Sequence, residues 1–222
     1  MKWIKKGMKV LHPVLKRLSV WYLSKVRYYR FKGIRVKVLP GVFHPGLFYS
    51  TRIMIRFVDT LELKDKRLLE LGAGSGLLAF YCARKGARVT ASDINTKAIE
   101  GLSESEEINQ LSVRPIVSDL FDKLDRDDFD IILINPPYYP KEPADMGERA
   151  WYCGTDFEYF RKLFVGLADL KLHTNVYMIL SEDCSVEEIQ NLAVHQALVF
   201  DLQYTEEMLG ERNFIYQISK AT

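Results

Sequence analysis

Hydrophobic residues along most of the chain follow two repeats that alternate with each other. Short apolar runs such as Ile131-Ile132-Leu133-Ile134 are typical of strands that are buried on both faces. Between them lie segments whose apolar residues recur every three or four positions, as on one face of a helix. The predicted strands are 67–71, 87–93, two short ones ending near 118 and 135, 176–180, 199–204 and 213–218, and the predicted helices are about 50–63, 77–85, 96–111, 156–172 and 186–196.

This alternation predicts an α/β fold. Strands that alternate with helices form a largely parallel sheet that is covered on both faces. Right-handed crossovers make it a doubly wound, Rossmann-like layer, in which ligands bind at the carboxyl ends of the strands. The last two predicted strands are too close together for a helical crossover, so we expect them to pair as an antiparallel C-terminal hairpin.

The first 40 residues show a different pattern. Apolar residues recur at helical spacing between lysines and arginines over 3–22, which predicts an amphipathic helix that Pro13 interrupts. A second apolar pattern over 31–38 predicts a short strand before Pro40-Gly41. We therefore expect a basic N-terminal extension over residues 1–40, with a helix and a short strand, and one α/β domain over residues 41–222.

Charge is distributed very unevenly between the two ends of the chain. Of the 31 basic residues, fourteen lie within residues 1–58, which contain no acidic residue, whereas all 29 acidic residues follow. Such an excess of positive charge should attract RNA, the ribosome or another anionic surface. The plain alternative is that the predicted helix packs its apolar face on the sheet and exposes its lysines to solvent.

Composition excludes several other classes of protein. Three scattered cysteines without a CxxC pair argue against a disulfide framework and a zinc site, and no histidine pair has metal-ligand spacing, so we expect no metal. No apolar run is long enough to span a membrane. Lys16 and Arg17 interrupt any apolar stretch near the start, which argues against a cleaved signal peptide. We therefore expect a cytoplasmic protein.

A glycine-rich loop follows the strand at 67–71. Within Glu70-Leu71-Gly72-Ala73-Gly74-Ser75-Gly76, the glycines allow a tight turn and a close approach of ligand to backbone. Asp93 ends the next strand and is placed to accept hydrogen bonds from a ribose. These features fit both dinucleotides and S-adenosylmethionine, but the glycine spacing and Glu70 favour the latter, since a carboxylate repels a pyrophosphate. Asp119 ends another strand and is either an adenine ligand or a helix N-cap or turn residue.

The motif Asn135-Pro136-Pro137-Tyr138 follows the apolar strand that ends near 135. Two prolines after an asparagine are also typical of a simple turn. However, the Asn135 side chain and the Pro136 carbonyl can accept hydrogen bonds from the two N–H groups of an amide or aryl amine. Tyr138 offers a face on which a planar group can stack. Together with the glycine loop, this motif predicts methyl transfer to a planar nitrogen.

The segments ELGAGSG, SDIN, SDLF and NPPYYP resemble those of the class I S-adenosylmethionine-dependent amino-methyltransferases. Within this group they are most similar to release-factor glutamine methyltransferases and related small-domain methyltransferases. The resemblance covers about residues 42–222 and implies a seven-stranded sheet with S-adenosylmethionine as cofactor. The residues that it implies at the cofactor are Glu70, Gly72, Gly74, Gly76, Asp93, Asp119 and Thr51. Those that we expect at the acceptor are Asn135, Pro136, Pro137, Tyr138 and Trp151, the last in a long segment that follows the motif.

The acceptor itself stays open among several classes. The resemblance implies the glutamine side chain of a protein such as a release factor. The basic extension favours instead an exocyclic amine of adenine or guanine in RNA or DNA. A third hypothesis is a non-catalytic adaptor that binds S-adenosylmethionine at a membrane or nucleic-acid surface.

Overall fold

A computed structural model describes residues 24–221 of the chain except 48, 126–128, 172 and 209. The helix predicted over 3–22 therefore lies outside the described residues. The elements are β1 (Arg27–Phe31), β2 (Ile34–Val38), α2 (Ser50–Val58), β3 (Arg67–Leu71), α3 (Leu77–Arg84), β4 (Arg88–Asp93), α4 (Thr96–Asn109), β5 (Val113–Val117), β6 (Ile131–Ile134), the 3-10 helix η2 (Glu148–Ala150), α5 (Glu158–Ala168), β7 (Asn175–Ser181), α6 (Val186–Val194), β8 (Leu198–Met208) and β9 (Glu211–Lys220).

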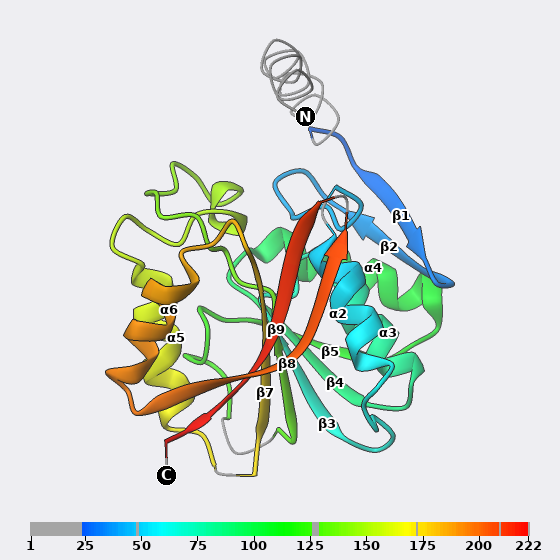
Figure 1. Ribbon diagram of the computed structural model, residues 1–222. Coiled ribbons are helices and arrows are strands. Elements are labelled where there is room, and N and C mark those ends of the chain that lie inside the picture. Colours follow the sequence, from blue (N-terminus) through cyan, green and yellow to red (C-terminus); the bar gives the residue numbers. More distant parts are fainter. Residues whose placement is uncertain (1–23, 48, 126–128, 172, 209, 222) are drawn as a thin grey trace.

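The main sheet contains seven strands in the order β5-β4-β3-β6-β7-β9-β8 (Figure 1). The first five of these are parallel to one another, whereas β9 runs antiparallel to both β7 and β8. This confirms the mainly parallel, doubly wound sheet and the C-terminal hairpin predicted from the sequence. The strand order reverses at β3, because β4 and β5 lie on one side of it and β6 and β7 on the other. In such sheets the crevice at this switch point is the usual ligand site.

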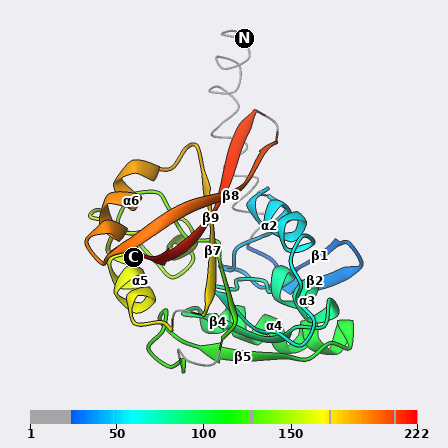
Figure 2. The ribbon, with the colours of Figure 1, turned by 60° about the horizontal axis from the view of Figure 1, so that its bottom comes forward.

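Helices cover both faces of the sheet, and each face has its own core. Figures 1 and 2 show α2 and α3 on one side and α5 and α6 on the other, and the residues of α4 pack with those of α2 and α3. Neighbouring residues of β3 serve the two cores, since Leu68 faces α3 and Leu69 faces α5, and both are fully buried. Complete burial stabilises each leucine side chain by ~1.5–3 kcal/mol. The carboxyl ends of these strands are therefore held rigidly.

The strand predicted over 31–38 is in fact a two-stranded antiparallel hairpin, β1–β2. Its turn has positive φ at Lys32 (43°) and Gly33 (82°), which matches the twist of a tight hairpin. The inner face of β2 packs in the same core as α3 and α4. Sequence reasoning missed β1 because Arg27–Phe31 mixes arginines with aromatic residues and has no apolar run. The domain boundary near residue 40 stays a prediction.

Polar side chains of α4 form hydrogen bonds with backbone groups at the outer edge of β2. Asn109 accepts a hydrogen bond from the Arg35 N–H at 2.9 Å and donates to the Arg35 carbonyl at 2.6 Å. Ser105 Oγ accepts from the Lys37 N–H at 2.9 Å. The hairpin therefore joins the domain through backbone groups as well as through its apolar face.

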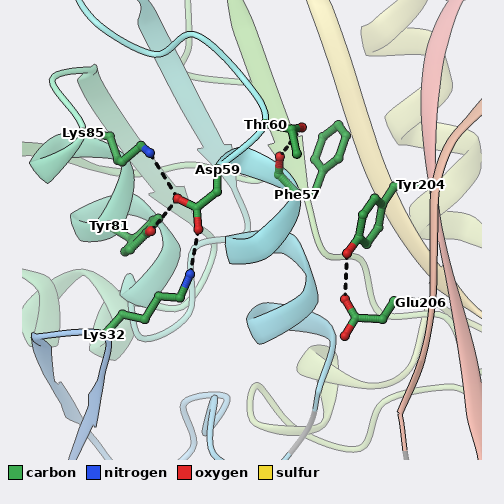
Figure 3. Close-up of polar contacts among 8 residues, drawn as sticks. All are labelled: Lys32, Phe57, Asp59, Thr60, Tyr81, Lys85, Tyr204 and Glu206. Carbon is green, nitrogen blue, oxygen red and sulfur yellow. Dashed lines mark hydrogen bonds and ion pairs between the residues drawn. The ribbon is translucent and has the colours of Figure 1, made fainter.

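A polar cluster around Asp59 fixes the turn of the hairpin to the domain (Figure 3). Asp59 accepts hydrogen bonds from Lys32 Nζ at 2.6 Å, from Tyr81 Oη at 2.6 Å and from Lys85 Nζ at 3.1 Å. Lys32 lies in the hairpin turn, whereas Tyr81 is in α3 and Lys85 follows it. Burial alone would raise the pKa of Asp59, but the three donors outweigh burial and lower the pKa to about 2.

The ends of several elements differ from the predictions. The helix predicted to reach 63 ends at Val58, and the Thr60 hydroxyl donates to the Phe57 carbonyl at 2.7 Å (Figure 3). Such local side-chain bonds compete with continuation of a helix. Near this end of α2, Arg56 forms an ion pair with Glu206 of β8, which also accepts from Tyr204 Oη at 2.9 Å. Strands β8 and β9 are longer than predicted.

The two outer strands of the main sheet have different edges. Strand β5 contains Pro115, which has no N–H. Strand β8 carries a register shift between Leu202 and Tyr204 in its pairing with β9.

Within the described part of the chain, every helix is too short or too polar to cross a membrane.

Candidate active site

A cavity of about 370 Å³ lies at the carboxyl ends of β3, β4, β5 and β6. Its wall is completed by the loop before α2 and by the segment 139–154. Of the twelve site residues predicted from the sequence, the structure brings eleven to this cavity, which makes it the candidate active site. They are Thr51, Glu70, Gly72, Gly74, Asp93, Asp119, Asn135, Pro136, Pro137, Tyr138 and Trp151.

Gly76 is the predicted cofactor residue that does not line the cavity. It forms the N-cap of α3 with a φ of 73°. A Cβ atom built at this position would lie 2.0 Å from Leu102 Cδ2. The third glycine of the loop therefore allows α4 to pack closely on the start of α3, and its predicted role at the cofactor is not supported by its position.

The other two glycines shape the loop itself. Gly72 and Gly74 have φ values of 76° and 54°, a region that only glycine adopts readily. The N–H groups of Gly72 and Ala73 both donate to the Ser92 carbonyl, at 2.9 and 2.8 Å. Apart from its chain neighbours, none of the described residues has an atom within 4 Å of a Cβ built on Gly72, so a ligand can approach the backbone there.

Glu70 is a buried carboxyl group in the wall of the cavity. It is 6% exposed and accepts a hydrogen bond from the Ala79 N–H, in the first turn of α3, at 2.8 Å. Burial raises the pKa of Glu70 to about 8, and this outweighs the opposite effect of the Ala79 hydrogen bond. A positive charge entering the cavity beside Glu70 would favour its ionised form.

Asp93, at the end of β4, connects the glycine loop to the start of α4. Its Oδ2 atom accepts from the Gly74 N–H and its Oδ1 atom from the Asn95 N–H, both at 2.8 Å. Burial raises the pKa of Asp93, opposed by these backbone donors. Each carboxylate oxygen has a second lone pair, so Asp93 can still accept hydrogen bonds from ligand hydroxyls.

Asp119 follows the end of β5 and lines the cavity there. Its carboxylate accepts from Lys162 Nζ of α5 at 2.7 Å, and the same ammonium bonds Asp122 at 2.7 Å. The neighbouring turn is held by the Ser118 hydroxyl, which accepts from the Lys123 N–H at 3.0 Å and donates to the Leu120 carbonyl at 2.8 Å. Among the described residues, no capping hydrogen bond to the Asp119 side chain is found. The N-cap interpretation of Asp119 therefore has no support, but Asp119 does begin a turn, because its carbonyl accepts from the Asp122 N–H at 3.2 Å.

The Asn135-Pro136-Pro137-Tyr138 motif begins directly after β6. Asn135 Nδ2 donates to Ser50 Oγ, the first residue of α2, at 3.1 Å. Because the amide is planar, this contact directs Asn135 Oδ1 away from Ser50, and no donor among the described residues reaches it. The Tyr138 ring packs at 4.8 Å from the Tyr139 ring, and burial raises the pKa of Tyr138 well above its usual range. Tyr138 therefore presents a neutral hydroxyl and a ring face.

The segment 139–154 is ordered by backbone contacts that sequence reasoning did not predict. Tyr139 N–H donates to the Trp151 carbonyl at 3.1 Å, and Cys153 N–H donates to the Tyr139 carbonyl at 3.0 Å. The Trp151 ring packs on Phe43 at 5.1 Å, so the loop before α2 and this segment meet at the cavity.

Several residues that line the cavity were missed at the sequence level, namely Asn95, Arg149, Tyr159 and Lys162. Asn95 follows Asp93 in the same polar strand end, which is a signal that could have identified it. Tyr159 and Lys162 lie on α5, and the periodicity of this helix is typical of one that only packs on a core. Only the fold brings that helix beside the end of β5.

Comparison with known proteins shows a consistent pattern. A family model described as methyltransferase small domain matches residues 33–148, just over half of the chain. A candidate protein N5-glutamine methyltransferase of Methanocaldococcus jannaschii is 34% identical over 110 residues, which make up 49% of this chain and 53% of that protein. A release factor glutamine methyltransferase of Fusobacterium nucleatum is 36% identical over 51% of this chain and 33% of its own length. A ribosomal RNA small subunit methyltransferase C of Hamiltonella defensa is 31% identical over 60% of this chain and 38% of its own length.

The chain thus spans about a third to a half of the length of these curated relatives. Solved structures share its fold over a larger part of the chain. The E. cuniculi Mtq2-Trm112 complex matches 82% of this chain and 99% of the solved chain with a TM-score of 0.63 and 19% identity. The T. thermophilus 16S rRNA N2 G1207 methyltransferase (RsmC), in complex with AdoMet and guanosine, matches 89% of this chain and 50% of its own, with a TM-score of 0.62 and 21% identity.

Proposed function

Because the chain belongs to the methyltransferase small domain family, we propose that it transfers a methyl group from S-adenosylmethionine to the nitrogen of a planar amide or amine in a macromolecule. The observation that carries this proposal is the position of Asn135. It lies in the same cavity as the glycine loop, and its side-chain amide is oriented by Ser50. An acceptor nitrogen held there would be next to the cofactor end of the cavity.

The residues around the glycine loop fit S-adenosylmethionine. Glu70, a buried carboxyl with its pKa raised to about 8, is suited to a cationic ammonium, which offsets the cost of ionisation. Asp93 retains lone pairs for ribose hydroxyls, and Asp119 can accept from an adenine amino group. A pyrophosphate brings no positive charge to offset the cost of ionising Glu70, so the raised pKa of Glu70 favours an ammonium over a dinucleotide. When bound, S-adenosylmethionine supplies a methyl group that its sulfonium already activates.

Asn135 and Pro136 prepare the acceptor. The lone pair of an amide or aryl amine is delocalised, so its nitrogen is a poor nucleophile. Asn135 Oδ1 and the Pro136 carbonyl accept the two N–H hydrogens, draw the nitrogen towards a tetrahedral geometry and raise its electron density. Tyr138 stacks on the planar group and fixes its angle. Positioning of this kind accounts for much of the rate, and the proton leaves after methylation.

The first candidate acceptor is the side-chain amide of a protein glutamine, as in a release factor. It is supported by the names of the M. jannaschii and F. nucleatum relatives. A glutamine side chain is a primary carboxamide, so it offers the two N–H groups that Asn135 and Pro136 require.

The second candidate is an exocyclic amine of a nucleobase in RNA. It is supported by the similarity to ribosomal RNA methyltransferases and by the excess of basic residues before Asp59. Such a base carries the same two N–H groups on a planar ring, and it would have to leave its stack to reach the cavity.

A methyl-transfer screen with labelled S-adenosylmethionine tests both candidates. Wild type, Asn135→Ala and the matched surface variant Asn191→Ala would be assayed on release factors, ribosomal proteins and ribosomal RNA. We expect Asn135→Ala to lower kcat by about 10²–10³-fold on the true substrate, in the range seen when one preorganised polar group is removed. Its affinity for the cofactor should stay within about twofold of wild type, because its contacts are to the acceptor. Full activity of Asn135→Ala would rule out this mechanism.

A further inference from the structure

The surface of the β1–β2 hairpin that points away from the core has an unusual composition. Strand alternation and the pairing register place Tyr28 opposite Lys37 and Arg30 opposite Arg35 on this surface, which we call the hairpin outer face. Tyr28, Arg30 and Arg35 are exposed, and Tyr28 is 50% exposed. The Arg35 guanidinium lies over the Tyr28 ring at 4.6 Å.

Four basic residues near the turn of the hairpin fall into two groups. Lys32 and Lys37 are neutralised by carboxylates of the domain, Asp59 and Glu104 respectively. In contrast, Arg30 and Arg35 face each other across the strands, and among the described residues neither has an acidic partner. Like charges directly opposite each other destabilise a hairpin. Their repulsion would be relieved by an anion bound between them.

We propose that the hairpin outer face binds the phosphate backbone of single-stranded RNA, with Arg30 and Arg35 on the phosphates and the Tyr28–Arg35 stack beneath an unpaired base. This inference rests on the second acceptor of the proposed function and names the surface that would hold it. Phosphate pairs with guanidinium groups through two parallel hydrogen bonds. Exposed aromatic rings and guanidinium planes are the surfaces on which unpaired bases stack.

The hairpin is close enough to the cavity to serve the same RNA strand. Gly41 lines the cavity and follows Arg35 by six residues, so the backbone between them spans at most about 20 Å. Asn95 Nδ2 fixes this turn by donating to the Gly41 carbonyl at 2.9 Å. Nucleotides next to a base in the cavity could therefore extend along the hairpin.

The hairpin is also rigid, which favours binding without ordering costs. Asp59 fixes its turn, and α4 satisfies the edge of β2 through Ser105 and Asn109. Its inner face is buried in the core. The outer face is therefore presented as a fixed surface.

Direct binding of the full chain to RNA tests the proposal. A labelled single-stranded RNA of about 20 mixed-sequence nucleotides would be titrated by fluorescence anisotropy at salt concentrations from roughly 50 to 300 mM. The slope of affinity against salt concentration over this range reports the number of phosphate contacts. The variant is R30Q/R35Q, and the matched control is R88Q/R114Q, which removes the same charge from exposed positions on β4 and β5. Two lost phosphate contacts should weaken binding on the order of tenfold near 0.1 M salt and reduce the salt slope by about 1.4.

The result expected is that R30Q/R35Q loses RNA affinity while R88Q/R114Q keeps it, with cofactor affinity of both variants equal to wild type and thermal unfolding at no lower temperature than wild type. Equal losses in the two variants would mean a general charge effect and would overturn the proposal. So would binding of wild type to anionic phosphatidylserine vesicles or to acidic proteins but not to RNA. The assay needs no catalysis, so if RNA binding depends on Arg30 and Arg35 while only a protein is methylated, the surface stands and the RNA acceptor fails.

Discussion

Burial gives the carboxyl group of Glu70 a higher pKa in the folded protein than in the unfolded chain. This difference makes the free energy of unfolding depend on pH. In the unfolded chain Glu70 ionises near pH 4.5, whereas in the fold its pKa is about 8. Between these values the unfolded state loses its proton first, so the free energy of unfolding falls as pH rises from about 4.5 to about 8. Below this window Glu70 has no effect, because it is protonated in both states.

We expect Glu70→Gln to remove this part of the pH dependence, since glutamine can still accept from the Ala79 N–H but does not ionise. Urea unfolding without cofactor at pH 5 and pH 8 would measure it. The loss of stability between the two pH values should be smaller in the variant than in wild type by about 1 kcal/mol or more. Equal slopes would show that Glu70 is not buried in its neutral form.

Gly76 and Gly210 offer a matched pair for separating backbone strain from packing. Both have positive φ, at 73° and 82°. A Cβ on Gly76 meets Leu102, whereas a Cβ on Gly210 meets no atom of the described, non-neighbouring residues within 4 Å. Gly210→Ala should cost about 1 kcal/mol of unfolding free energy for the left-handed backbone alone. Gly76→Ala should cost a further ~1–3 kcal/mol for overpacking. Chemical denaturation measures both variants, and equal costs would contradict the close packing of α3 on α4.

At the level of single residues, the site could be predicted where a motif follows a strand. The glycine loop and the Asn135 motif sit at strand ends, so the parallel sheet alone brings them together. The family match confirms the resemblance and the enzyme class that these motifs indicated. Lys162 and Tyr159 could not be predicted, because α5 reaches the cavity only through the packing of the second core. Gly76 matched the cofactor pattern but lies outside the cavity wall, where a Cβ would meet Leu102.

Among the elements, the turn of the β1–β2 hairpin depends on one carboxylate. Asp59→Asn removes the negative charge that Lys32 and Lys85 share, and these contacts are partly exposed, so we expect a loss of about 1 kcal/mol. Because the pKa of Asp59 is lowered to about 2, this stability is present above about pH 4 and disappears as pH falls towards 2.

Hydrogen exchange of the β1 and β2 amides and urea unfolding would test this role. Exchange in the hairpin should be faster in Asp59→Asn, with little change in β7. The exposed Asp183→Asn is the control for loss of one charge. Unchanged exchange in the hairpin would mean that its apolar face alone holds it in place.

The main elements were predictable because strands and helices here differ clearly in period. Strand β6 is wholly apolar because its side chains enter the cores on both faces of the sheet, and this pattern is typical of a buried strand. Strand β1 was not predictable, because its inward residues are tyrosine and phenylalanine and its outward residues include Arg30. Such a strand is stabilised by its partner β2 and by Arg52 of α2, which donates to Tyr29 Oη at 2.7 Å, and not by its own composition.

For the molecule as a whole, cofactor binding should raise stability by mass action. S-adenosylmethionine at about 100 times its Kd adds about 2.7 kcal/mol. For a chain of this size that corresponds to a rise in Tm of about 5–10 °C, measurable by differential scanning fluorimetry. NAD is the matched control ligand, because it also carries a ribose and an adenine but has no ammonium to place beside Glu70. A similar shift with NAD, or none with S-adenosylmethionine, would contradict the proposed cofactor.

The acceptor could not be predicted from the sequence, because the walls of the cavity come from distant segments. The loop before α2 and the segment 139–154 meet only in the fold, where Phe43 contacts Trp151. The relatives do not decide between a protein and an RNA, and this chain spans only about a third to a half of their length. The excess of basic residues before Asp59 is the global property on which the proposal of an RNA acceptor rests.

The two outer strands of the sheet also determine how the protein resists aggregation. An open strand edge invites pairing with other chains, and each edge here carries a different safeguard. On β5, Pro115 removes a backbone donor. On β8, the register shift near Leu202 bends the strand, and acidic residues such as Asp201 and Glu207 surround its exposed apolar side chains. Replacing Pro115 with valine would therefore restore a backbone donor to this edge strand and should promote aggregation, which light scattering would measure.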